Sequence, residues 1–108
     1  MEEVGTLTGN VSSWQHLDAE TKELAAKVKE GGSKKECRTG PYIVTARRDM
    51  VYVNSTNSDG EKQGEPLACF RAPYFVRAVS CRGTSVVVGC KDGQVVFLEA
   101  PLLADHTG

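Results

Sequence analysis

The sequence holds little of the chemistry on which most enzymes depend. It has only two histidines, His16 and His106, near opposite ends of the chain, and neither has an acid and a serine at the spacing of a hydrolase triad. Phosphate-loop, dinucleotide-binding, zinc-protease and EF-hand motifs are all missing. The four cysteines form no C-x-x-C pair, whereas structural zinc ligands come in closely spaced couples. The sequence therefore predicts no enzyme, no metal, no cofactor and no small-molecule substrate.

Long apolar runs and an excess of one charge are missing too. No stretch of about 18 apolar residues exists, as a membrane-spanning helix would need, and the acidic start of the chain lacks a secretory signal. The formal net charge is −1, with acids and bases interleaved, which disfavours nonspecific binding to nucleic acid or anionic membranes. We therefore expect a protein of the cytoplasm or nucleus whose thiols stay reduced.

What is present fits one small domain, and its first part, residues 1–40, predicts a helix and a linker. Ser12 and Gln15 have the form of a capping box, and Gly31-Gly32 supplies a stop. Gly31–Gly40, with its glycines and charges, predicts a flexible linker. The helix would be amphipathic, with an apolar face that comprises Trp14, Leu17, Leu24, Ala25 and Val28. That face could pack on the chain's own β region, on a second copy or on a partner helix.

The second part, residues 41–108, is predicted to be β. Short runs of valine, isoleucine and aromatic residues are bounded by turn residues, and Asn57–Glu65 predicts a polar loop. No helical pattern separates these runs, so the sheet should be an antiparallel meander. The predicted strands are Tyr42–Ala46, Val51–Asn54, Pro66–Phe70, Val76–Cys81, Ser85–Gly89 and Val95–Leu98.

A hairpin pattern occurs twice, in Tyr42–Ser55 and in Val86–Glu99. In both copies a strand ends in a small residue, a basic residue and an aspartate make the turn, and an apolar strand returns. Ala46 and Gly89, the small residues of the two copies, are 43 residues apart. This offset falls within the period of about 40–45 residues that is typical of WD40 propeller blades.

The second copy carries a family resemblance. Val76–Glu99, VRAVSCRGTSVVVGCKDGQVVFLE, resembles most of a WD40 repeat. Asp92 stands where that family places the aspartate that ties its tight turn together by hydrogen bonds, and Gly93 suits a left-handed turn position. Leu98-Glu99 stands where the Trp-Asp dipeptide would be, and Ala72-Pro73 where Gly-His would be.

The first copy departs further from the family pattern. Asp49 keeps the turn acid, but no glycine follows it, and Asn54-Ser55 replaces Trp-Asp. The resemblance spans Tyr42 to Leu103, which amounts to about one and a half blades. It implies a mainly β fold, an antiparallel meander like part of a WD40-type propeller, with one N-terminal amphipathic helix.

The resemblance also implies a function. A partial propeller would act as a non-enzymatic protein–protein interaction module or scaffold, and it would bind a protein partner or itself through exposed strand edges, since closed propellers have about four to eight blades. Arg47, Arg48 and Lys91 would then lie at corresponding turns on one rim, where an acidic peptide or a phosphorylated segment could bind. The alternative is a self-contained small α+β or β-barrel adaptor domain with no propeller relationship, because two hairpins of this kind suit many β proteins.

Overall fold

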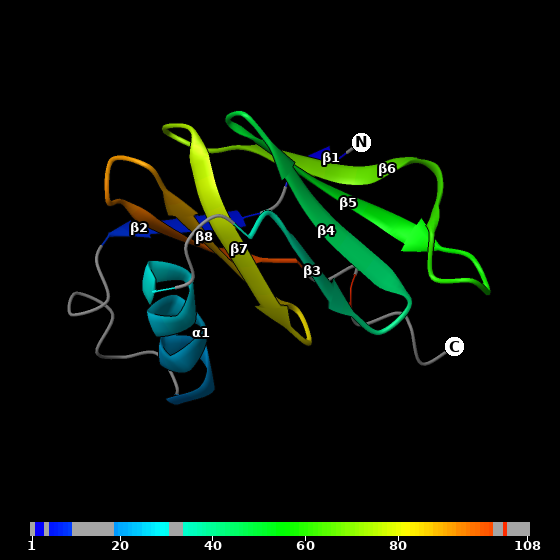
Figure 1. Cartoon of the computed structure of the whole chain (residues 1–108), viewed down its shortest axis with the longest axis horizontal. Coiled ribbons are helices and arrows are strands. Elements are labelled where there is room, and N and C mark those ends of the chain that lie inside the picture. Colours follow the sequence, from blue (N-terminus) through cyan, green and yellow to red (C-terminus); the bar gives the residue numbers. More distant parts are fainter. Residues whose placement is uncertain (1, 4, 10–18, 31–33, 101–102, 104–108) are drawn as a thin grey trace.

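Two β-sheets and one helix make up the fold (Figure 1). The computed structural model describes residues 2–3, 5–9, 19–30, 34–100 and 103. The elements are β1 (Glu2–Glu3), β2 (Gly5–Gly9), α1 (Ala19–Glu30), β3 (Glu36–Thr39), β4 (Tyr42–Arg47), β5 (Met50–Thr56), β6 (Lys62–Arg71), β7 (Val76–Arg82), β8 (Ser85–Cys90) and β9 (Val95–Glu99).

The strands divide into two sheets that are each built around an antiparallel meander. The first sheet has the order β1-β6-β5-β4-β3, and the second has the order β2-β9-β8-β7. All neighbours are antiparallel except β1, which pairs with β6 in parallel at one edge. In the second sheet, β2 comes from the start of the chain and pairs with β9 from near its end. The prediction of antiparallel meanders is therefore confirmed, with the addition of two strands from the N-terminal region.

The second sheet lies in the middle of the molecule, because it is buried on both faces. Side chains of successive strand residues point to opposite faces, so Val86 and Val88 of β8 face the first sheet whereas Val87 between them faces α1. Between the sheets, one core joins residues of both, including Val44 and Phe70 from the first. A strand covered on both faces reads as a continuous apolar run, and the Val-Val-Val of β8 has that pattern.

Helix α1 packs on the chain's own β region. Leu24, Ala25 and Val28 are buried against a small cluster on the second sheet that includes Ala78 and Val95. The predicted helix and its apolar face are thus confirmed over Ala19–Glu30. The rest of the predicted helix, with its capping box and glycine stop, lies outside the described residues. Within the described part of the chain, no helix has the length and apolar character needed to cross a membrane.

All six predicted strands are present, each extended by one to a few residues. Four residues of the predicted linker, Glu36–Thr39, form strand β3 instead, because they pair with β4 and turn the Cys37 side chain toward the core. Likewise β6 begins at Lys62, inside the predicted polar loop, because Lys62 and Gln63 pair with the end of β5. Neither segment has an alternating apolar pattern, so each forms a strand because it pairs with a neighbouring strand.

Candidate functional site

Three connections between strands meet at one edge of the molecule, which we call the rim. They are the β4–β5 turn, the β6–β7 connection and the β8–β9 turn. Backbone hydrogen bonds hold them together. The Val76 N–H donates to the Arg48 carbonyl at 2.7 Å, and the Lys91 N–H donates to the Phe75 carbonyl at 2.8 Å. The rim is therefore a fixed surface built from both sheets (Figure 1).

A hollow of about 340 Å³ lies on this surface and is lined by Lys35, Arg48, Phe75 and Lys91. We call it the rim hollow. Lys35 directly precedes β3, and its carbonyl accepts a hydrogen bond of 3.0 Å from the Ala46 N–H. The charged lining thus consists of three cations from three separate segments of the chain, and no acidic residue contributes to it.

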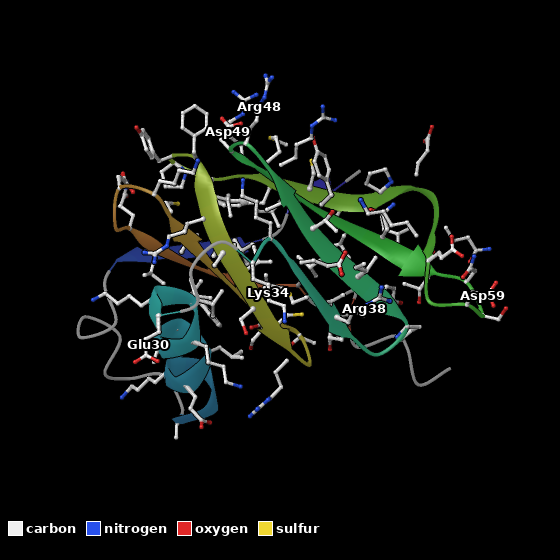
Figure 2. The ribbon with its side chains drawn as sticks, viewed as in Figure 1. Glu30, Lys34, Arg38, Arg48, Asp49 and Asp59 are labelled. Atoms are coloured by element: carbon white, nitrogen blue, oxygen red, sulfur yellow. The ribbon has the colours of Figure 1, made fainter. Side chains whose placement is uncertain are left out.

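The nearest acids of the rim are engaged elsewhere. Asp49 lies beside Arg48 in the sequence, but its carboxylate is 3.9 Å from the guanidinium of Arg71. Asp92 follows Lys91, but its carboxylate accepts hydrogen bonds from the backbone and the side-chain amide of Gln94. Across the described ranges, none of the three cations of the rim hollow is in an ion pair. Arg48 and Lys91 are exposed and Lys35 is half-buried. Figure 2 shows Arg48 at the tip of its turn.

Arg48 adopts a backbone conformation that is costly for a residue with a side chain. Its φ is 59°, and it is the sole residue other than glycine with positive φ in the part of the chain that the structure describes. Such left-handed conformations cost about 1 kcal/mol or more outside glycine, and asparagine or aspartate tolerates them better than arginine does. Glycine would adopt this φ at a lower cost. The stability of the hairpin therefore does not explain why an arginine stands at this position.

The three cations that the sequence analysis placed on the rim do not all lie together. Arg48 and Lys91 line the rim hollow, and Arg47 does not. Arg47 lines two other hollows with Tyr52, and Arg48 and Asp49 also line one of these two. The reason is alternation, because Arg47 still belongs to β4 and is on its outer face. Lys35 and Phe75 were missed, since the first was assigned to a linker and nothing in the repeat pointed to the second. The pair Tyr74-Phe75 after a proline was a usable signal, because adjacent aromatics in a turn are often exposed.

The two turn aspartates of the repeated hairpin have different roles. Asp92 accepts the N–H of Gln94 at 3.1 Å, and the Gly93 N–H donates to the Cys90 carbonyl at 3.0 Å. Gly93 has a φ of 94°, which an L-residue with a side chain rarely adopts. Asp49 instead pairs with Arg71, and its carbonyl receives the Ala72 N–H at 2.7 Å. Asp92 therefore stabilises its own turn, whereas Asp49 links its turn to the β6–β7 connection.

A second hollow lies between α1, β3 and β7, and its charge is mixed. Its lining includes Glu30 and Glu36 as well as Lys34 and Arg38. The guanidinium of Arg38 also donates a hydrogen bond to the Gly60 carbonyl. Figure 2 shows Glu30 at the end of α1, Lys34 in the connection before β3 and Arg38 in β3. With both signs of charge present, this surface has no clear preference for a charged ligand.

Two thiols meet where the sheets face each other. Cys37 of β3 and Cys81 of β7 both pack against the central core and are hydrogen-bonded to each other. This hydrogen bond and then burial raise the pKa of the Cys37 thiol well above its usual range, because both favour the neutral form. Burial, followed by the charge of Asp92, raises the pKa of the Cys90 thiol. In the described segments, no three His, Cys, Asp or Glu residues are grouped as metal ligands would be.

The raised pKa of Cys37 leads to a prediction about alkaline stability. Below the ordinary thiol pKa of 9.0, the thiol is neutral in both the folded and the unfolded chain, so it adds no pH dependence. Above it, the unfolded chain loses this proton while the folded chain keeps it, so the free energy of unfolding falls by at most about 1.4 kcal/mol per pH unit. We expect Cys37→Ser to show a smaller loss of stability than the parent between about pH 9 and 10.5 in urea denaturation. Parallel pH curves for parent and variant would contradict this account.

The chain matches no protein-family model and shows no significant similarity to a curated protein. Its class therefore rests on its structure. It is a mainly β protein of antiparallel meander sheets with one N-terminal helix. One surface of this protein has a hollow lined by three cations, which form no ion pair among the residues that the structure describes, and by one exposed aromatic ring.

Proposed function

We propose that the chain is a non-enzymatic protein–protein interaction module made of two blades of a WD40-like propeller. One observation carries this proposal, namely two runs of four neighbouring antiparallel strands, β3-β4-β5-β6 and β7-β8-β9-β2. The first run is a meander, and in the second β2 from the start of the chain takes the fourth place. The hairpin that repeats at an offset of 43 residues forms β4 and β5 in one meander and β8 and β9 in the other. The repeated sequence thus occupies the same two middle positions in both sheets.

The way in which the meanders meet also supports a relation to propeller blades. Their first strands, β3 and β7, are edge strands that lie side by side, and the Val79 N–H donates to the Lys34 carbonyl at 3.0 Å. The Thr39 hydroxyl donates to the Gly83 carbonyl at 3.1 Å near the other end of these strands. The sheets share one core, as neighbouring blades do. Their equivalent turns, β4–β5 and β8–β9, both reach the rim, where propellers usually receive partners.

A specific observation favours the alternative, a self-contained adaptor domain. Polar residues, among them Thr45, Arg47 and Asn54, lie on the outer face of the first sheet, because they alternate with residues that face the core. Ile43 and Tyr52 share this face with them. The opposite face of the molecule is covered by α1. Polar residues on an outer face reduce the need for a further sheet to cover it, which agrees with a self-contained domain.

Light scattering coupled to size-exclusion chromatography distinguishes the two proposals. A piece of an open propeller should associate with itself increasingly as its concentration rises, because its strand edges can pair with those of another copy. A self-contained domain should stay monomeric at all concentrations and unfold in a single cooperative transition. A stable, cooperatively melting monomer would overturn the propeller proposal and leave the adaptor domain in its place.

A further inference from the structure

We infer that the rim hollow binds a phosphorylated side chain of a partner peptide, and that an apolar residue of the same peptide lies against Phe75. The inference rests on the proposed role as an interaction module and names the ligand of its rim. The residues involved are Lys35, Arg48, Phe75 and Lys91.

The charge of the rim hollow fits a phosphate better than a carboxylate. Three cations from three segments line it, and neither Asp49 nor Asp92 is part of its lining. A phosphorylated side chain carries about two negative charges and three acceptor oxygens at neutral pH, whereas a carboxylate carries one charge and two oxygens. Arginine and lysine both form strong charge-assisted hydrogen bonds to phosphate oxygens. The three cations that line this hollow carry more charge than one carboxylate can neutralise.

An apolar surface adjoins the cations. Phe75 is 47% exposed and Tyr74 is 45% exposed, although side chains of this kind are usually buried. Their ring centroids are 5.2 Å apart and the rings are tilted by 57°, so the two side chains support each other. In the described part of the chain, three large apolar side chains are exposed, and Tyr74 and Phe75 are two of them. A peptide that carries an apolar residue next to its phosphorylated residue would contact both the charged hollow and these exposed aromatic rings.

The backbone holds the hollow in place before any ligand arrives. The carbonyls of Lys35, Arg48 and Phe75 each accept a hydrogen bond from another segment of the rim. A site that is already ordered loses less entropy on binding. The positive φ of Arg48 agrees with this role, since backbone strain of this kind is often retained at binding sites.

A peptide fits this surface better than a nucleic acid does. Nucleic acids are bound by extended groups of cations that follow the phosphate backbone. Here three cations line a single hollow, and the chain as a whole has a net charge of −1. One compact anionic group is therefore the expected ligand.

The test uses the full chain and three fluorescent pools of degenerate peptides that differ at one fixed position, which is phosphoserine, serine or glutamate. Binding is followed by fluorescence anisotropy at low salt. We expect the phosphoserine pool to bind at least about tenfold more tightly than the other two, because only phosphate can engage all three cations. Peptides retained by the protein should be enriched in apolar residues next to the phosphoserine.

The variants have a matched control on the same turn. Lys35→Glu and Lys91→Glu should each weaken binding of the phosphoserine pool by about tenfold or more, whereas Arg47→Glu should change it by less than about twofold. Each of these changes reverses one charge, and Lys91 and Arg47 are both exposed, whereas Lys35 is half-buried. Arg47→Glu is therefore the matched control for Lys91→Glu, because Arg47 does not line the rim hollow. Arg48→Gly should weaken binding too, although glycine suits the φ of this position and the melting temperature should not fall. Circular dichroism of each variant shows whether the fold is retained.

Several outcomes would overturn the inference. These are equal binding of the three pools, no binding of any pool, or an Arg47→Glu effect as large as that of Lys91→Glu. Stronger binding of a single-stranded oligonucleotide than of the phosphoserine pool would assign the hollow to nucleic acid instead. The proposed function is tested separately. A monomer in light scattering would contradict the propeller proposal but not phosphoserine binding at the rim hollow. A chain that self-associates but does not bind phosphoserine would contradict the ligand of the rim hollow but not the propeller proposal.

Discussion

A chain that lacks residues 1–9 is expected to lose the cooperative unfolding of the parent protein. The segment contributes β2, which pairs with β9 at five positions from Gly5↔Glu99 to Gly9↔Val95. Without it, β9 becomes an open edge of the central sheet, and its backbone groups lose their partners. A net backbone hydrogen bond contributes about 1 kcal/mol, so losing this ladder removes several kcal/mol from a total of about 5–15 kcal/mol. Urea denaturation followed by circular dichroism measures the difference.

The control adds the missing strand back as a separate peptide. A synthetic peptide of residues 1–11 added to the shortened chain should restore part of the lost stability, whereas a scrambled peptide should not. If the chain without residues 1–9 melts as cooperatively and at the same midpoint as the parent, β2 does not stabilise the second sheet.

The second large effect is expected at Gly89, where α1 approaches β8. A methyl group added at this position would overlap a side-chain methyl of Val28 on the helix, because the glycine lies directly beneath it. Gly89→Ala therefore forces α1 away from the sheet or Val28 out of its preferred rotamer. Overpacking of this kind costs about 1–3 kcal/mol. We expect a lower urea midpoint for Gly89→Ala, with the strands of the second sheet still formed.

Val28→Ala tests the cause of that loss. Alone it should destabilise the protein by about 1–2 kcal/mol, since it removes buried methyl groups. Combined with Gly89→Ala, it frees the space that the new methyl needs, so the double variant should be more stable than the sum of the single losses predicts. Additive losses would show that the helix and β8 do not meet at this pair.

Several parts of the fold could be predicted because their signals are local. The helix over Ala19–Glu30 has an apolar face with helical spacing, and the six predicted strands contain apolar runs bounded by turn residues. The turn of Asp92 and Gly93 was readable for the same reason, since turn chemistry depends on a few neighbouring residues. Arg48 and Lys91 were singled out because the repeated hairpin places them at equivalent turns.

The rim hollow could be predicted only in part, because its lining comes from four segments. Arg48 and Lys91 belong to the repeated hairpin, but Lys35 precedes a strand that has no alternating pattern. Phe75 reaches the hollow through the hydrogen bond between its carbonyl and the Lys91 N–H. Arg47, next to Arg48 in the sequence, is excluded by the alternation of strand faces. Residues brought together by long-range contacts carry no shared signal in the sequence.

By itself, the sequence determined the helix, the six apolar strands, their order as antiparallel meanders and the repeat at 43 residues, because periodicity and turn chemistry act over short distances. Only the tertiary structure decided that β2 completes the second sheet beside β9, that β3 belongs to the first sheet, and that three cations meet at one hollow. The segments β2 and β3 are short and mainly polar, so their own residues favour no strand. They become strands because a neighbouring strand offers unpaired backbone groups, which must find partners in the folded chain.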